Sequence, residues 1–225
     1  MGKVRMGILD GFKGKVGTDV GSFWKGKKVM RAYNEFPSNP RTSAQLIQRQ
    51  KFALIASLGG VFSDFLKMTL RGYANGEQNS LIGQFVGQNI NSVNVSGSTV
   101  EVDYETLSLT PPKSPLTTVA LGEADFSTPL TVSVPVDDNY LDPEKNSAND
   151  KLYLVVLAKA NDLSEADAVY SDGTAKRTSE SVSLRVPGFW QGRFVEVYAV
   201  LTADPLSQRA GECSKTLYCG SGRIA

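Results

Sequence analysis

The sequence predicts an α+β protein built from a glycine-rich basic arm, a short helical segment and a carboxy-terminal β-sandwich of the immunoglobulin or fibronectin type. Three observations carry this prediction. Glycine recurs every three to five residues between positions 7 and 26, apolar residues in 41–91 follow helical spacing, and 92–225 alternates short apolar runs with Gly, Pro, Asn and Asp. We expect domains at 1–40, 41–91 and 92–225, and we expect the last to fold alone.

The arm mixes its glycines with bases and large apolar side chains. Each glycine inside a helix costs about 1 kcal/mol relative to alanine, so strands and turns are favoured here. Residues 1–75 hold 13 Lys/Arg and 4 Asp/Glu, a net charge of +9, whereas 76–225 hold 11 and 19, a net charge of −8. The two sum to +1, and such an asymmetric chain can bind an acidic partner with its basic end. The expected partner-binding residues are Ile8, Phe12, Lys15, Phe23, Trp24, Lys25, Lys27, Lys28 and Arg31.

The apolar spacing and the capping residues of segment 41–91 predict three helices. Thr42 or Ser43 is placed to cap the first helix, and we expect Gly59-Gly60 to end it. The second has apolar residues at i, i+3 and i+4 from Val61 to Tyr73. Ser80 is placed to cap the third.

Residues 92–225 predict eight or nine strands. The alternation in 130–136 indicates a half-buried strand, and 194–201 has apolar residues on both faces, as in a strand covered on both sides. This number of strands favours a two-sheet sandwich, although the Cys…Trp…Cys spacing of antibody domains is absent. The expected strands are 93–95, 99–104, 107–110, 130–136, 152–158, 167–170, 181–186 and 194–201, with 213–218 as a ninth.

The composition removes the common catalytic arrangements. The chain has no histidine, which excludes Ser-His-Asp, Cys-His and His-metal sites, and two cysteines are too few for a zinc site made of thiolates. Cys213 and Cys219 would lie about 20 Å apart on one face of an extended strand, so a disulfide between them needs a chain reversal. The run from Gly11 to Gly17 lacks the Walker and Rossmann patterns. We therefore predict no enzymatic activity, no cofactor and no metal.

Two features leave a second interpretation open. The acidic stretch 137–150 offers oxygen ligands for calcium, but it lacks the EF-hand spacing, which favours a solvated loop. Trp190 precedes the most apolar strand, where an aromatic core residue is the first interpretation and a carbohydrate-stacking platform the second.

The start of the chain lacks the apolar run of a signal peptide, and no apolar stretch approaches the 18 or so residues that span a bilayer. We expect a protein of a virion or of the host cytoplasm.

The first 52 residues carry two signatures. The first is Gly7-Ile8-Leu9-x-Gly11-Phe12-x-Gly14-Lys15-Val16-Gly17 with a later Trp24-Lys25-Gly26, and the second is Asn39-Pro40-Arg41-Thr42-x-Ala44-Gln45-Leu46-x-Gln48-Arg49-x-Lys51-Phe52. They resemble the opening of an uncharacterised family found in Bacteroidetes and their phages and mobile elements. The resemblance implies an immunoglobulin-like carboxy-terminal domain and supplies no catalytic residues. From the second signature we expect a second contact at Arg41, Gln45, Gln48 and Arg49.

Together these observations predict a structural protein of a bacteriophage virion, associated with the capsid or the tail. Its arm would latch onto other protein subunits, of its own kind or neighbouring ones, to form an oligomer. The alternative is a nucleic-acid-binding protein whose bases neutralise phosphate while its aromatic residues stack on bases. A surface protein that binds or acts on glycans is a more distant third.

Overall fold

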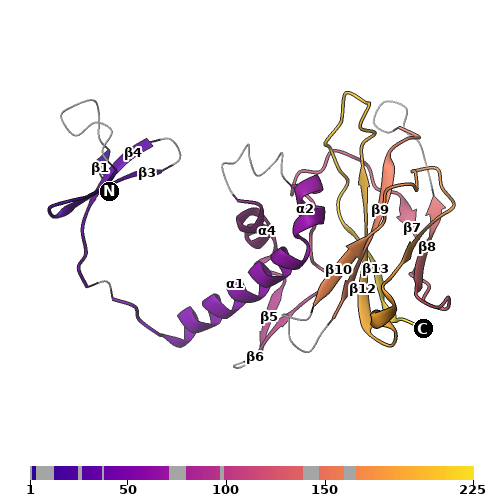
Figure 1. Ribbon diagram of the computed structural model, residues 1–225, viewed down its shortest axis with the longest axis horizontal. Coiled ribbons are helices and arrows are strands. Elements are labelled where there is room, and N and C mark those ends of the chain that lie inside the picture. The colour runs from indigo at the N-terminus through magenta and orange to yellow at the C-terminus, as the bar shows by residue number, and fades with distance from the viewer. Residues whose placement is uncertain are drawn as a thin grey trace. The chain divides into compact units, whose positions relative to one another are not determined.

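The computed structural model describes residues 2–3, 13–24, 27–36, 38–70, 80–96, 99–138, 147–159 and 166–225 (Figure 1). The chain forms two compact units, Met1–Gln45 and Leu46–Ala225. Within the described residues, three α-helices and several small antiparallel sheets confirm the mixed α+β class. The division into three domains stays a prediction.

The first unit is a small antiparallel sheet, as expected for a glycine-rich segment that disfavours a helix. Its strand order is β1-β4-β3-β2. Gly17, in the turn between β2 and β3, has a φ of 60°, which glycine adopts without a steric cost. The strands are β1 (Gly2–Lys3), β2 (Gly14–Val16), β3 (Asp19–Trp24) and β4 (Lys27–Ala32).

The helices are α1 (Ser43–Val61), α2 (Ser63–Thr69) and α4 (Leu81–Asn89). The Ser80 hydroxyl accepts the Gly83 N–H at 3.0 Å, which confirms that cap. The expected end at Gly59-Gly60 is wrong, since α1 continues to Val61. The reason is packing: a Cβ on buried Gly59 would lie 3.0 Å from the Phe85 ring, so the glycine lets α4 approach α1 closely. Tyr73 lies outside the described residues.

No single helix in the described part of the chain is long and apolar enough to cross a membrane. The α1–α2 pair passes that test only when the two helices are taken together, and the pair is bent by 81° at its break.

The second unit contains one four-stranded sheet of order β10-β9-β12-β13, one three-stranded sheet of order β11-β8-β7, and the β5–β6 hairpin. Residues 188–190 form the 3₁₀ turn η2 (Gly188–Trp190). The strands are β5 (Val93–Ser96), β6 (Thr99–Val102), β7 (Ala120–Leu121), β8 (Thr131–Asp138), β9 (Lys151–Ala158), β10 (Asp167–Tyr170), β11 (Ser181–Arg185), β12 (Phe194–Thr202) and β13 (Leu217–Arg223).

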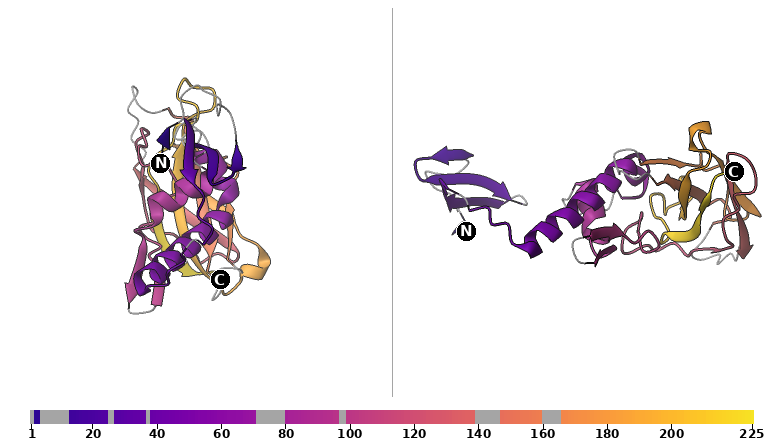
Figure 2. Two further views of the ribbon diagram at one scale, coloured as in Figure 1. Left: turned by 90° about the vertical axis from the view of Figure 1, so that its left-hand side faces the viewer. Right: turned by 90° about the horizontal axis from the view of Figure 1, so that it is seen from below.

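The four-stranded sheet is covered on both faces, with the helices on one side and β7, β8 and β11 on the other (Figures 1 and 2). Along β9, Leu152, Leu154 and Val156 belong to the core shared with the three-stranded sheet, whereas Tyr153 and Val155 belong to the core shared with the helices. Residues 195–201 of β12 are buried on both faces, as the sequence predicted, whereas Phe194 at the start of the strand is 60% exposed.

Residues 107–110 do not form the expected strand. Leu107 and Leu109 point into the core, but side chains bind the backbone between them: the Asn89 Oδ1 accepts the Ser108 N–H at 2.7 Å, and the Thr216 Oγ1 accepts the Leu109 N–H at 2.8 Å. The alternating apolar residues of 107–110 therefore belong to an irregular segment that is buried in the core, and the predicted strand is wrong. Strand β13 also begins later than the expected 213–218, and β7 was not expected.

The described elements do not show a clear immunoglobulin sandwich. Two sheets share a core, yet a helical layer covers the far face of the larger one, and Phe62 contacts Tyr198 of β12 edge-on at 6.3 Å between ring centroids. The helical segment is therefore part of the same folded unit as the strands. The expectation that residues 92–225 fold alone stays untested, and this packing argues against it.

A candidate assembly interface

The face of the amino-terminal sheet that carries Phe23 exposes most of its apolar side chains. In the strand register Phe23 opposes Lys28, Gly21 opposes Met30, and Asp19 lies between Val16 and Ala32. Opposed residues share a face of a sheet, so we call the side that carries Val16, Phe23, Lys28, Met30 and Ala32 the apolar face, on which Asp19 also lies. Val16 is 58% exposed and Phe23 is 50% exposed.

The opposite face is cationic. Lys15 opposes Val20, and Val20 opposes Arg31. The Lys15 Nζ lies 3.5 Å from the centroid of the Tyr33 ring, a cation–π contact. Val29 is the one buried apolar side chain within the described residues of this sheet. The sheet therefore has almost no core of its own in its described part.

Six of the nine expected arm residues lie on the described strands of this sheet, and the register places Phe23 and Lys28 on one face and Lys15 and Arg31 on the other. Trp24 opposes Lys27 in the register of β3 and β4. Ile8, Phe12 and Lys25 lie outside the described residues. Val16 was expected from the sequence among the apolar side chains of the arm that need burial, although it was not one of the nine expected partner-binding residues.

The four residues of the expected second contact lie at the start of α1, and they divide by role. Thr42 and Gln45 form a reciprocal cap, in which the Gln45 N–H donates to Thr42 Oγ1 and the Thr42 N–H donates to Gln45 Oε1, both at 3.4 Å. Gln45 therefore helps to cap α1, which begins at Ser43, and Arg41 precedes the helix. Gln48 and Arg49 share a helical face with Phe52, which is 54% exposed and was missed from the sequence.

Trp190 is a core residue. It is fully buried and lies in the core between the two sheets, so it cannot serve as a carbohydrate platform. The first interpretation from the sequence is confirmed at this position.

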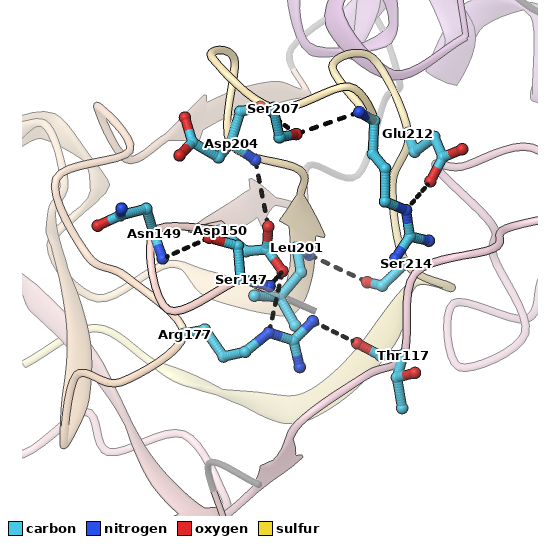
Figure 3. A network of polar contacts seen from close by, with 11 residues as sticks. Thr117, Ser147, Asn149, Asp150, Arg177, Leu201, Asp204, Ser207, Glu212 and Ser214 are labelled. Atoms are coloured by element: carbon cyan, nitrogen blue, oxygen red, sulfur yellow. Dashed lines mark hydrogen bonds and ion pairs between the residues drawn. The ribbon is translucent and has the colours of Figure 1, made fainter. Parts of the chain in front are cut away.

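The buried pair Asp150–Arg177 ties the acidic stretch to the body of the second unit (Figure 3). The Arg177 Nε donates to Asp150 Oδ2 at 3.1 Å and its Nη2 donates to the Thr117 carbonyl at 2.7 Å. The Asp150 carboxylate also accepts the N–H groups of Ser147 at 3.0 Å and Asp204 at 3.2 Å. Asp150 is thus a structural anchor and is not placed as a calcium ligand, while residues 139–146 lie outside the described residues.

Glu196 is a second buried carboxylate, and the sequence signal for it was a charge inside an apolar strand. It forms an ion pair with Lys159 and accepts the Tyr218 hydroxyl at 2.6 Å. Burial, followed by the hydrogen bond to Glu196, raises the pKa of Tyr218 to about 12, so the phenol stays protonated at neutral pH. The described residues contain no group of three or more Cys, Asp or Glu side chains placed to hold a metal ion.

Cys213 and Cys219 are free and buried, and they belong to different cores. Burial raises the pKa of each thiol to about 12 from a usual value near 9. The folded state therefore keeps protons that the unfolded state releases above pH 9, and the free energy of unfolding falls as pH rises from 9 to 12.

We expect native Cys213 and Cys219 to resist a thiol reagent at pH 8 and to react at once in guanidinium. Replacing both by alanine should flatten the loss of stability between pH 9 and 12, measured by urea unfolding. Rapid labelling of the native chain would contradict this burial.

A model of a family of unknown function, DUF6266, matches residues 11–213. The chain belongs to the DUF6266 family. The match runs through both amino-terminal signatures from Gly11 onward, so the expected membership of a family without an assigned function is confirmed. No curated protein matches this DUF6266 chain. The immunoglobulin-like domain and the phage origin of the family stay predictions.

Proposed function

We propose that this chain is a non-enzymatic structural protein that joins an assembly through the apolar face of its amino-terminal sheet. The observation that carries the proposal is that Val16 and Phe23 are at least half exposed on a sheet with one buried apolar side chain in its described part. Burying each of these side chains would stabilise a contact by about 1.5–3 kcal/mol, so association with another protein surface is favourable.

The particle that we propose is a phage virion, with the chain associated with the capsid or the tail. The support for this finer proposal is the resemblance of the two amino-terminal signatures to a family of Bacteroidetes and their phages. Met1–Gln45 forms a compact unit of its own, which suits a subunit that offers this sheet to a neighbour.

The cationic face favours a second candidate, binding of nucleic acid. Lys15, Arg31 and the Tyr33 ring share this face, a combination that suits phosphate contact together with base stacking. The two candidates differ in their response to salt, because phosphate contacts weaken steeply as salt rises and apolar contacts do not.

We expect the double variant Val16→Ser, Phe23→Ser to keep its fold and to lose at least about tenfold of its incorporation into the oligomer or particle, because it removes the two most exposed apolar side chains of this face. The measurement is the share of chain that sediments with the particle fraction, at 50 mM and at 500 mM salt.

Leu206→Ser is the matched control, since Leu206 is 94% exposed on the second unit and outside the sheet. Normal incorporation of the double variant would refute the assembly proposal. Normal incorporation combined with salt-sensitive binding of DNA or RNA that Lys15→Glu abolishes would replace it with the nucleic-acid candidate.

A further inference from the structure

A pocket of about 540 Å³ opens where the two sheets of the second unit end, beside edge strand β13 and the segment that follows edge strand β7. The Ala124 N–H donates to the Cys219 carbonyl at 2.9 Å and so joins the two walls. Its lining includes Glu105, Leu121, Glu123, Phe126 and Tyr218.

The pocket combines an apolar part with negative charge. Leu121 and Phe126 pack against the core between the sheets. A Cβ on Gly222 would lie 2.3 Å from the Phe126 ring, so the ring can occupy this position only because residue 222 is glycine. Glu105 and Glu123 are exposed and come from separate segments, and neither forms an ion pair within the described part of the chain. An apolar surface beside two carboxylates fits a partner that presents an apolar side chain next to a cation.

The apolar face of the amino-terminal sheet presents that pattern, because Phe23 of β3 lies directly opposite Lys28 of β4 on one face. The net charges of the two units are opposite in sign, which also favours this contact. Residues 1–45 hold 9 Lys/Arg and 3 Asp/Glu, a net charge of +6, and residues 46–225 hold 15 and 20, a net charge of −5. Contact between the first unit of one copy and the second unit of another is therefore attractive.

We infer that the Phe23–Lys28 pair of one copy docks into the Glu105–Glu123 pocket of a second copy. The inference rests on the proposed function and names its partner. Phe23 contacts Leu121 and Phe126, and the Lys28 ammonium pairs with the two carboxylates. Because each copy carries one such sheet and one such pocket on separate units, two copies can exchange them reciprocally in a two-fold dimer, or further copies can add head-to-tail into a ring or an open chain.

The test measures self-association of the purified full-length chain by sedimentation velocity over a concentration series at low salt. We expect the wild type to form species larger than a monomer, and at least about tenfold weaker association for Glu105→Gln, Glu123→Gln. The control Glu101→Gln, Glu180→Gln removes the same two charges from exposed positions outside the pocket and should associate like wild type.

A charge exchange makes the test specific. Lys28→Glu and Glu123→Lys should each weaken association by about tenfold or more, and the double variant that carries both should recover most of it. An unchanged Glu105→Gln, Glu123→Gln variant, or the absence of recovery in the exchange, overturns the inference.

The outcomes separate this inference from the proposed function. A chain that stays monomeric, or whose pocket variants behave like wild type, refutes docking between copies. If Val16→Ser, Phe23→Ser still loses incorporation into the particle in either case, the assembly proposal stands with a different partner surface. If that variant incorporates normally, both proposals fail.

Discussion

A fragment of residues 92–225 is expected not to fold, whereas residues 46–225 should unfold in one cooperative transition. Without α1, α2 and α4, five side chains on the four-stranded sheet lose their cover: Tyr153, Val155, Leu157, Tyr198 and Val200. Exposing them costs roughly 7–15 kcal/mol in total, which equals the whole stability of an ordinary domain of about 5–15 kcal/mol.

Circular dichroism and thermal melting of the two fragments decide this prediction. The fragment 46–225 is the control, because it keeps both cores and lacks only the amino-terminal unit. A cooperative melt of 92–225 with a β-rich spectrum would show that the helices are an accessory layer and that the boundary predicted from the sequence at residue 92 divides two domains.

Replacing Asp150 by alanine is expected to destabilise the chain by about 3–5 kcal/mol. The substitution leaves the Arg177 guanidinium, whose side chain is 0% exposed, without its counter-charge. It also removes the acceptor for the N–H groups of Ser147 and Asp204. Urea unfolding followed by tryptophan fluorescence measures the loss, since Trp190 is fully buried in the folded chain.

The exposed pair Asp64–Lys67 supplies the matched control for Asp150. Its atoms approach to 2.6 Å, but the side chains are 73% and 56% exposed, so Asp64→Ala should cost less than about 1 kcal/mol. The variant Asp150→Leu, Arg177→Met should recover much of the stability that Asp150→Ala loses, because it removes both charges together. Equal losses for Asp150→Ala and Asp64→Ala would refute a structural role for the buried pair.

The elements that the sequence predicted well are those whose residues follow one local rule. Strand β10 was expected at its observed bounds, since 167–170 is a short apolar run between turn residues. The cap at Ser80 followed from side-chain chemistry within one helical turn. The glycine-rich start predicted strands because its glycines disfavour a helix, and the structure places β2, β3 and β4 there.

The candidate interface was only partly within reach of the sequence. Bases and aromatic residues marked the arm, but which of them share a face depends on the strand register, and this separates Phe23 and Lys28 from Lys15 and Arg31. The pocket beside β13 had no local signal, since Glu105, Glu123 and Tyr218 meet only when two sheet edges come together.

Local chemistry, read from the sequence alone, determined the class of the protein, its strands and caps, its basic amino-terminal region and the lack of histidine chemistry. Only the tertiary structure decided that helices cover the larger sheet and that Gly59 lies inside α1 against Phe85. It also decided that Asp150 forms an ion pair with Arg177, 27 positions away in the sequence. The physical reason is range. Caps, turns and glycine preferences act within a few residues, whereas burial, ion pairing and pocket formation depend on residues distant in the chain.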